Sequence, residues 1–214
     1  MKIIFSVLLI FCILPAFSQG VRLNGYASYT FDDNVDSYYD PNAYYNGKIK
    51  GGFMWGIGLE YMLRENYGLE LSYLRQDTKA PLNYYNAGPK YTDFDLGVNY
   101  IMLGGNRYLR KPEGKVEGLF GVQLGMNIMN LENPDNKNSS SKTFFAWGLK
   151  AGATFWASEK VGIRLQANLL SAVQSVGGGF YFGTGGAGAG VASYSTIYQF
   201  GLGGGIVVNL SNKK

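Results

Sequence analysis

The sequence predicts an all-β protein: an eight-stranded antiparallel up-and-down transmembrane barrel with long outside loops and short periplasmic turns. First, apolar and polar residues alternate in eight segments, and the side chains of a β-strand switch faces at every residue. Second, the links between these segments are alternately long and short. Third, aromatic residues make up 15% of the 214-residue chain and charged residues only 16%, whereas soluble domains carry about a quarter charged residues.

The N-terminal segment predicts a secretory signal peptide. A basic start precedes an apolar run over residues 3–14, and Ala16 and Ser18 supply the small residues expected before a cleavage site. An uncleaved anchor is the alternative. We expect residues 1–18 to be removed and residues 19–214 to form one transmembrane barrel domain.

Eight strands follow in order, each long enough for the 9–11 residues that a tilted membrane strand needs. They are predicted at residues 20–30, 48–62, 67–76, 91–109, 115–129, 143–156, 161–173 and 193–210. Long loops are expected at residues 31–47, 77–90, 130–142 and 174–192, and short polar turns at 63–66, 110–114 and 157–160. Glycines at 104 and 105 predict a bulge or an early exit in the fourth strand. The Gly-rich segment 177–190 fits either a loop or a strand extension.

One face of these strands is rich in aromatic rings and the other is rich in glycine. The aromatic face holds Phe53, Trp55, Tyr61, Tyr67, Tyr73, Phe94, Tyr100, Phe120, Phe145, Trp147, Phe155, Tyr198 and Phe200. A soluble barrel would turn this face inward, but an eight-stranded interior is only just wide enough for side chains. We therefore expect the aromatic face to meet lipid and the glycine face to line the lumen.

The same alternation predicts a network of charges in the lumen. Its members are Arg22, Lys50, Glu60, Glu70, Asp93, Asp95, Glu117, Lys150 and Arg164. Because an isolated buried charge is costly, we expect these groups to pair, with Lys150 at mid-height and Lys50 near Asp93 and Asp95. A lumen closed by salt bridges is the expected result, and a gated ion path through the same residues is the alternative.

The outside loops contain tyrosines that predict a binding surface. Tyr38, Tyr39, Tyr44, Tyr45, Tyr84 and Tyr85 recur beside Asn and Asp, and tyrosine combines an apolar ring with a polar tip. They would contact sugars or protein partners, or else form a girdle at the outer lipid boundary. Lysines at or beside the outside rim would pair with lipopolysaccharide phosphates or remain solvated; they are Lys48, Lys79, Lys90, Lys137 and Lys142. The acidic run at residues 32–40 fits a solvated loop better than a Ca²⁺ site.

With this pattern of strands, loops and charges, the chain resembles the small eight-stranded outer-membrane proteins of the OmpA/OmpX-like barrel superfamily. More narrowly, it resembles the outer membrane protein beta-barrel domain or porin-family proteins common in Bacteroidetes. The signal ending Ala16-Phe17-Ser18 is typical of those bacteria, and Gly205, Val208 and Leu210 partly match the assembly signal of a last strand. The terminal aromatic residue of that signal is missing. The resemblance implies a bacterial outer-membrane location and assigns no functional residue.

Catalysis is not predicted. Lipid-modifying barrels would need a histidine beside a serine or carboxylate, and the chain has no histidine; its one cysteine lies in the predicted signal peptide. No cofactor, metal or nucleic-acid partner is predicted, since the net charge is only +4. We expect a structural or interaction barrel, free-standing or an accessory subunit of a larger outer-membrane assembly, with outer-membrane lipid and other proteins as partners. The alternatives are a narrow channel or conduit for small or hydrophobic solutes, and a surface adhesin acting through its tyrosine-rich loops.

Overall fold

The computed structural model describes residues 20–38, 44–85, 89–110, 114–173, 179–183, 186–190 and 197–210. The predicted signal peptide and Tyr39 lie outside these residues. Among the described residues, no helix is long and apolar enough to cross a membrane.

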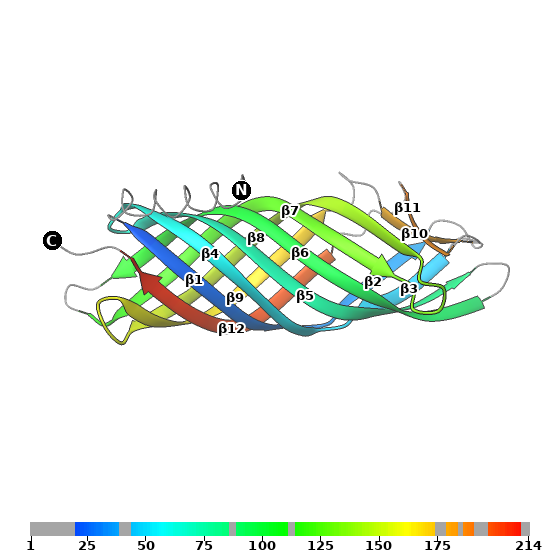
Figure 1. The fold of residues 1–214 in the computed structure, drawn as a ribbon, viewed down its shortest axis with the longest axis horizontal. Coiled ribbons are helices and arrows are strands. Elements are labelled where there is room, and N and C mark those ends of the chain that lie inside the picture. Colours follow the sequence, from blue (N-terminus) through cyan, green and yellow to red (C-terminus); the bar gives the residue numbers. More distant parts are fainter. Residues whose placement is uncertain are drawn as a thin grey trace, which may run out of the picture.

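The chain folds into one closed antiparallel barrel of eight strands (Figure 1). The barrel strands are β1 (Val21–Thr30), β4 (Gly52–Arg64), β5 (Tyr67–Tyr85), β6 (Pro89–Arg110), β7 (Val116–Glu132), β8 (Ser139–Trp156), β9 (Val161–Val173) and β12 (Ile197–Asn209). Each strand pairs with the next in this order, and β12 pairs with β1 to close the ring. The predicted fold class is confirmed.

Much of the sequence predicted as long loops is strand. β2 (Asp33–Tyr38) and β3 (Tyr44–Ile49) form a hairpin that follows β1 and joins β5, and β10 (Gly179–Gly183) pairs with β11 (Gly186–Gly190). In Figure 1 these four short strands all lie at one end of the barrel, opposite the start of β1 and the end of β12. Continued pairing satisfies backbone groups that a loop would leave to water or side chains, which explains the extension.

Two further details of the strands differ from the prediction. β6 runs through Gly104 and Gly105 with an unbroken register to both neighbours, so the predicted bulge is wrong. The register shift instead falls between Met62 and Arg64, at the end of β4. The predicted short turns after β4 and β8 are confirmed, and residues 111–113 of the third lie outside the described residues.

The outer surface of the barrel carries a continuous apolar belt. Exposed large apolar side chains on it include Phe53, Trp55, Ile57, Leu59, Tyr61, Leu69, Leu71, Leu103, Phe120, Val122, Leu124, Phe155, Ile163, Leu165, Phe200, Leu202 and Ile206. A soluble protein rarely exposes a patch of this size, whereas a barrel in lipid requires one. The predicted orientation of the aromatic face is therefore confirmed on most strands. Phe94 and Tyr100 of β6 are exceptions, because both are buried inside the barrel.

The belt ends sharply on β5 and β6. Tyr73 pairs with Ile101 in the last apolar outward row, and Arg75 pairs with Asn99 in the first polar one. Beyond this row the outward side chains are polar, among them Asp77, Lys79, Asp93, Asp95, Asn130, Glu132 and Ser141. We call residues 75–85, 89–99, 130–132 and 139–143, together with β2 and β3, the outer extension.

Glycines keep the lumen narrow. A Cβ atom added at Gly125 would lie 2.0 Å from the Ile101 carbonyl oxygen, and one added at Gly205 would lie 1.8 Å from that of Gly25. Both glycines belong to the face predicted to point inward. Their lack of a side chain lets neighbouring strands and lumen side chains approach closely.

Candidate functional site: the barrel interior and its two mouths

Two buried glutamates from neighbouring strands form the centre of the lumen network. Glu70 on β5 accepts hydrogen bonds from Lys150 and Tyr26, and forms a salt bridge with Lys150. Glu60 on β4 accepts from the Tyr108 hydroxyl at 2.5 and 2.6 Å. The two carboxylates oppose each other in the β4–β5 register, which brings two negative charges close together.

Two asparagine side chains connect these carboxylates. Asn24 donates to Glu70 at 2.8 Å and to Glu60 at 3.4 Å. Asn106 donates to Glu60 at 2.7 Å and to Glu70 at 3.0 Å. Because each amide nitrogen carries two hydrogens, one amide can serve both anions. Neutral donors thus supplement the single ammonium group of Lys150.

Arg164 is the largest fully buried side chain of the network. Its exposed fraction is 0%, and it donates to Thr154 Oγ1 at 3.1 Å and to the Tyr108 hydroxyl at 3.5 Å. It therefore reaches Glu60 through Tyr108 and forms no direct salt bridge within the described residues. Its Nη1 group has no hydrogen-bond partner there.

A second ion-pair cluster lies nearer the end with the short turns. Arg22 Nη1 contacts Glu117 Oε1 at 2.8 Å, and both groups are buried. Arg110 Nε contacts the other oxygen of Glu117. The Arg22 guanidinium also lies 4.8 Å from the Tyr108 ring centroid and 5.1 Å from that of Trp156. Such contacts fix the position of the cation.

Six of the nine charges predicted for the lumen are therefore buried inside it: Arg22, Glu60, Glu70, Glu117, Lys150 and Arg164. The prediction is wrong for Asp93 and Asp95, which lie on the outward face of β6. Lys50 is part-exposed and contacts Asp93 at 3.5 Å, while Lys79 contacts Asp95 at 3.5 Å. The expected proximity of Lys50 to Asp93 is thus present, but near the rim of the outer extension.

The reason for this error is a reversal of polarity along β6. Within the belt, outward residues are apolar because they meet lipid. Beyond the belt the outward face is polar, so Asp93 and Asp95 point outward there. Phe94 and Tyr100 occupy the alternate, inward positions, with exposed fractions of 1% and 0%.

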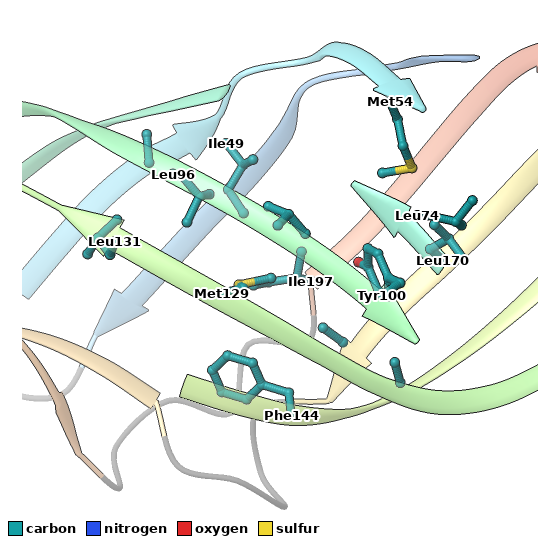
Figure 2. Close-up of a cluster of buried hydrophobic side chains, with 14 of the residues drawn as sticks. Ile49, Met54, Leu74, Leu96, Tyr100, Met129, Leu131, Phe144, Leu170 and Ile197 are labelled. Atoms are coloured by element: carbon teal, nitrogen blue, oxygen red, sulfur yellow. The ribbon is translucent and has the colours of Figure 1, made fainter. Parts of the chain in front are cut away.

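The outer half of the interior is consequently apolar. Figure 2 shows side chains from several strands meeting in one cluster. Its members include Ile49, Met54, Leu74, Ala80, Leu82, Phe94, Leu96, Val98, Tyr100, Met102, Met129, Leu131, Phe144, Ala146, Leu170, Ala172 and Ile197. We call this cluster the outer plug. Sequence reasoning missed it, although the inward residues of β6 from Phe94 to Met102 are all apolar or aromatic.

A short chain of neutral hydrogen bonds accompanies the outer plug. The Tyr100 hydroxyl donates to Gln199 Oε1 at 2.8 Å, and Gln199 Nε2 donates to Gln76 Oε1 at 2.8 Å. Both amide oxygens of this chain are thereby satisfied. Asn127, which lies opposite Tyr100 in the β6–β7 register, has no hydrogen-bond partner for either side-chain atom among the described residues.

Two cavities lie near opposite ends of the barrel, the first of them on the outward face of the outer extension. One of about 510 Å³ lies on the outer extension and is lined by Arg75, Asp77, Thr78, Lys79, Asp95, Leu96, Gly97, Asn130, Leu131, Glu132 and Ser139. The other, about 540 Å³, lies at the end with the short turns. No group of three or more potential metal-binding side chains occurs among the described residues.

The hairpin of β2 and β3 places predicted loop tyrosines on paired strands. Tyr38 lies opposite Tyr44, and Tyr45 lies opposite Tyr84 of β5. Tyr85 ends β5 opposite Pro89. The backbone thus brings five of the six predicted tyrosines to the outer extension, and Tyr39 lies outside the described residues.

The same end of the barrel carries an exposed ion pair. Lys48 Nζ contacts Asp32 Oδ2 at 2.5 Å, and the Gly51 amide donates to the other oxygen of Asp32 at 2.7 Å. The hydrogen bond from Lys48 lowers the pKa of Asp32, and the carboxylate in turn raises the pKa of Lys48. Lys48 is one of the lysines predicted near the outside rim, and here its charge is already balanced by Asp32.

Comparison with known proteins supports the fold. No family model and no curated protein matches the chain. Neisserial surface protein A matches over 89% of this chain and 97% of its own, with a TM-score of 0.59 and 12% identity. Ail of Yersinia pestis matches over 88% and 99% (TM-score 0.44, 14% identity), and the outer membrane protease OmpT of Escherichia coli over 89% and 97% (TM-score 0.48, 8% identity). The likeness to the neisserial protein shows the fold of a small outer-membrane barrel.

Proposed function

We propose that the protein is a closed, non-catalytic barrel of the bacterial outer membrane with a structural or interaction role. It acts either as a free-standing barrel or as an accessory subunit of a larger outer-membrane assembly. The observation that carries this proposal is the combination of an outward apolar belt around the barrel with an interior closed by buried ion pairs and the outer plug.

The belt supports the membrane location. Large apolar side chains face outward on every barrel strand, and on β5 and β6 the belt ends between the row of Tyr73 and the row of Arg75. In outer-membrane barrels the short turns face the periplasm and the longer connections face outside. By this rule, the outer extension faces away from the cell and the turn at residues 157–160 faces the periplasm.

The interior supports the absence of transport. A solute would have to separate Lys150 from Glu70 and Arg22 from Glu117, and each separation exposes charges to a low dielectric. It would also have to displace Tyr100 and Met102, both fully buried in the outer plug. We therefore favour a structural role over that of a narrow channel.

The outer extension supports an interaction role. Its outward face is polar and charged, and its hairpin carries the tyrosines proposed to contact sugars or proteins. This face rises directly above the lipid boundary, where lipopolysaccharide or a neighbouring membrane protein would contact it. A surface adhesin acting through the same tyrosines is the second form of this proposal.

Cysteine labelling tests the location and orientation. Ser141 lies in the outer extension and Ser158 in a short turn, and both side chains are exposed. A membrane-impermeant maleimide should label Ser141→Cys on intact cells and Ser158→Cys only after the outer membrane is permeabilised. Labelling of Ser158→Cys alone on intact cells would reverse the orientation. Equal labelling of both variants in a soluble fraction would contradict the membrane location.

Conductance tests closure independently. Pure protein in planar bilayers should give no reproducible single-channel steps. Steps whose ion selectivity changes in Lys150→Glu would replace the structural role by a channel.

Photo-crosslinking from position 95 in native membranes, with the lipid-facing position 124 as control, tests the interaction role. This role requires protein or lipid adducts that form from position 95 and not from position 124.

A further inference from the structure

The mouth at the short-turn end contains an open cavity with an excess of positive charge. It measures about 540 Å³, and its lining includes Arg22, Arg110, Lys115, Glu117, Trp156 and Glu159. Three of these side chains are cationic and two are anionic. The Arg22–Glu117 ion pair forms part of the cavity wall, at the end of the lumen that opens toward the short turns.

The buried carboxylate of Glu117 uses only part of this positive charge. Arg22 contacts it through both terminal nitrogens, at 2.8 and 3.4 Å. Arg110 contacts it through Nε, its Nη groups carry further N–H donors, and its side chain is 38% exposed. Among the described residues, Lys115 forms no salt bridge. Two cationic groups at the cavity wall are therefore available to a ligand.

The surrounding side chains hold the charge in place. Arg22 is 3% exposed and its guanidinium contacts the rings of both Tyr108 and Trp156, and its Nε has no hydrogen-bond partner among the described residues. Because these contacts fix the Arg22 side chain, its guanidinium stays at the cavity wall. The low-dielectric walls of the cavity strengthen the electric field of the cations that line it. Trp156 adds an apolar ring beside the cations.

We propose that this cavity binds an oxyanion, a carboxylate or phosphate group carried by a molecule on the short-turn side of the membrane. The Nη pair of Arg110 matches the two oxygens of such a group, and Lys115 supplies a second charge. Trp156 contacts the apolar part of the same molecule. That the short-turn side is the periplasm rests on the orientation proposed above. The proposal that the cavity binds an oxyanion does not depend on this orientation.

The oxyanion can come from a soluble periplasmic molecule or from the headgroup of an inner-leaflet phospholipid. The test distinguishes these sources. The chain has three tryptophans. Trp55→Phe and Trp147→Phe together leave Trp156 as the only tryptophan emitter. This detergent-solubilised protein is titrated with N-acetylglycine, inorganic phosphate and dihexanoyl phosphatidylglycerol at constant ionic strength.

We expect a saturable change in Trp156 emission with at least one probe. Saturation by N-acetylglycine or phosphate indicates a soluble ligand, and saturation by the lipid alone indicates a headgroup. Arg110→Gln should weaken binding about tenfold, because a charge-assisted bidentate contact is lost while Arg22 still neutralises Glu117. Lys115→Gln should weaken it less.

Arg107→Gln is the matched control. Arg107 lies on the same strand but stacks on Tyr67 at 5.4 Å, outside the cavity lining, so its loss should leave binding unchanged. The absence of saturation with all three probes would overturn the proposal. So would equal affinities of Arg110→Gln and the parent protein, or an equal loss in Arg107→Gln. Thermal unfolding of each variant verifies that it is folded, and none of these results depends on membrane orientation.

Discussion

Removing the ammonium group of Lys150 should strongly destabilise the barrel. Lys150→Met retains most of the side-chain volume but leaves the Glu70 carboxylate buried, with 2% of its surface exposed. Tyr26, Asn24 and Asn106 would still donate hydrogen bonds, yet no cation would balance the charge of Glu70. Breaking a buried ion pair by removing one partner costs about 3–5 kcal/mol, and we expect the lower part of that range because three donors remain.

The double variant Lys150→Met with Glu70→Gln separates charge from packing. It removes both charges and retains the shape, so it should recover most of the loss and lie within about 1–2 kcal/mol of the parent. Lys137→Met is the exposed control: its side chain is 74% exposed and contacts Glu132 at 3.5 Å, a pair worth about 0–1 kcal/mol. Urea unfolding in lipid vesicles gives the three free energies. Equal costs for Lys150→Met and Lys137→Met, or no recovery in the double variant, would refute the buried ion pair.

Substitutions at three other interior positions, Arg164, Gly125 and Phe94, are followed by the same assay, with the exposed Gly105 as a comparison. Arg164→Ala should cost several kcal/mol, about 3–5, because it removes a fully buried cation behind the Tyr108–Glu60 contact; a cost no larger than that of Lys137→Ala would contradict this. Gly125→Ala should cost about 1–3 kcal/mol, because its Cβ would meet the Ile101 carbonyl oxygen. Gly105→Ala has open space around the new Cβ and should be neutral or stabilising by about 0.5–1 kcal/mol. A larger cost for Gly105→Ala than for Gly125→Ala would disprove the close approach at Gly125. Phe94→Ala should cost about 3–5 kcal/mol as a core truncation, and a negligible loss would place this ring outside the barrel after all.

The alternation of side chains allowed most of the barrel to be predicted. Strand period fixes which residues share a face, and the abundance of rings on one face fixes which face meets lipid. This reasoning places Arg22, Glu60, Glu70 and Arg164 inside the barrel, as the structure has them. It does not identify their partners. The contact between Lys150 and Glu70 depends on how strands distant in sequence are staggered around the barrel, which no local pattern encodes.

The prediction failed where β6 leaves the belt. The sequence prediction assumed that apolar side chains face outward along the whole of β6, and it therefore assigned Asp93 and Asp95 to the lumen and Phe94 to the outer face. The rule depends on the medium outside the barrel, so it reverses where lipid gives way to water. The outward change from Tyr73 to Arg75 on the neighbouring β5 marks that boundary in the sequence.

The barrel therefore has two stabilising regimes along one set of strands. Inside the belt, lipid surrounds the protein and burial of apolar surface gives little gain, so the interior is held by ion pairs such as Lys150–Glu70 and Arg22–Glu117. Beyond Arg75 and Asn99, water surrounds the same strands, and the hydrophobic effect favours an apolar interior there, as in the part of the outer plug formed by Phe94, Leu96 and Val98. This change of solvent explains why long connections became paired strands: beyond the membrane they can bury their own apolar face. A self-supporting outer extension holds its polar outward face in a fixed geometry, which is what an interaction surface requires.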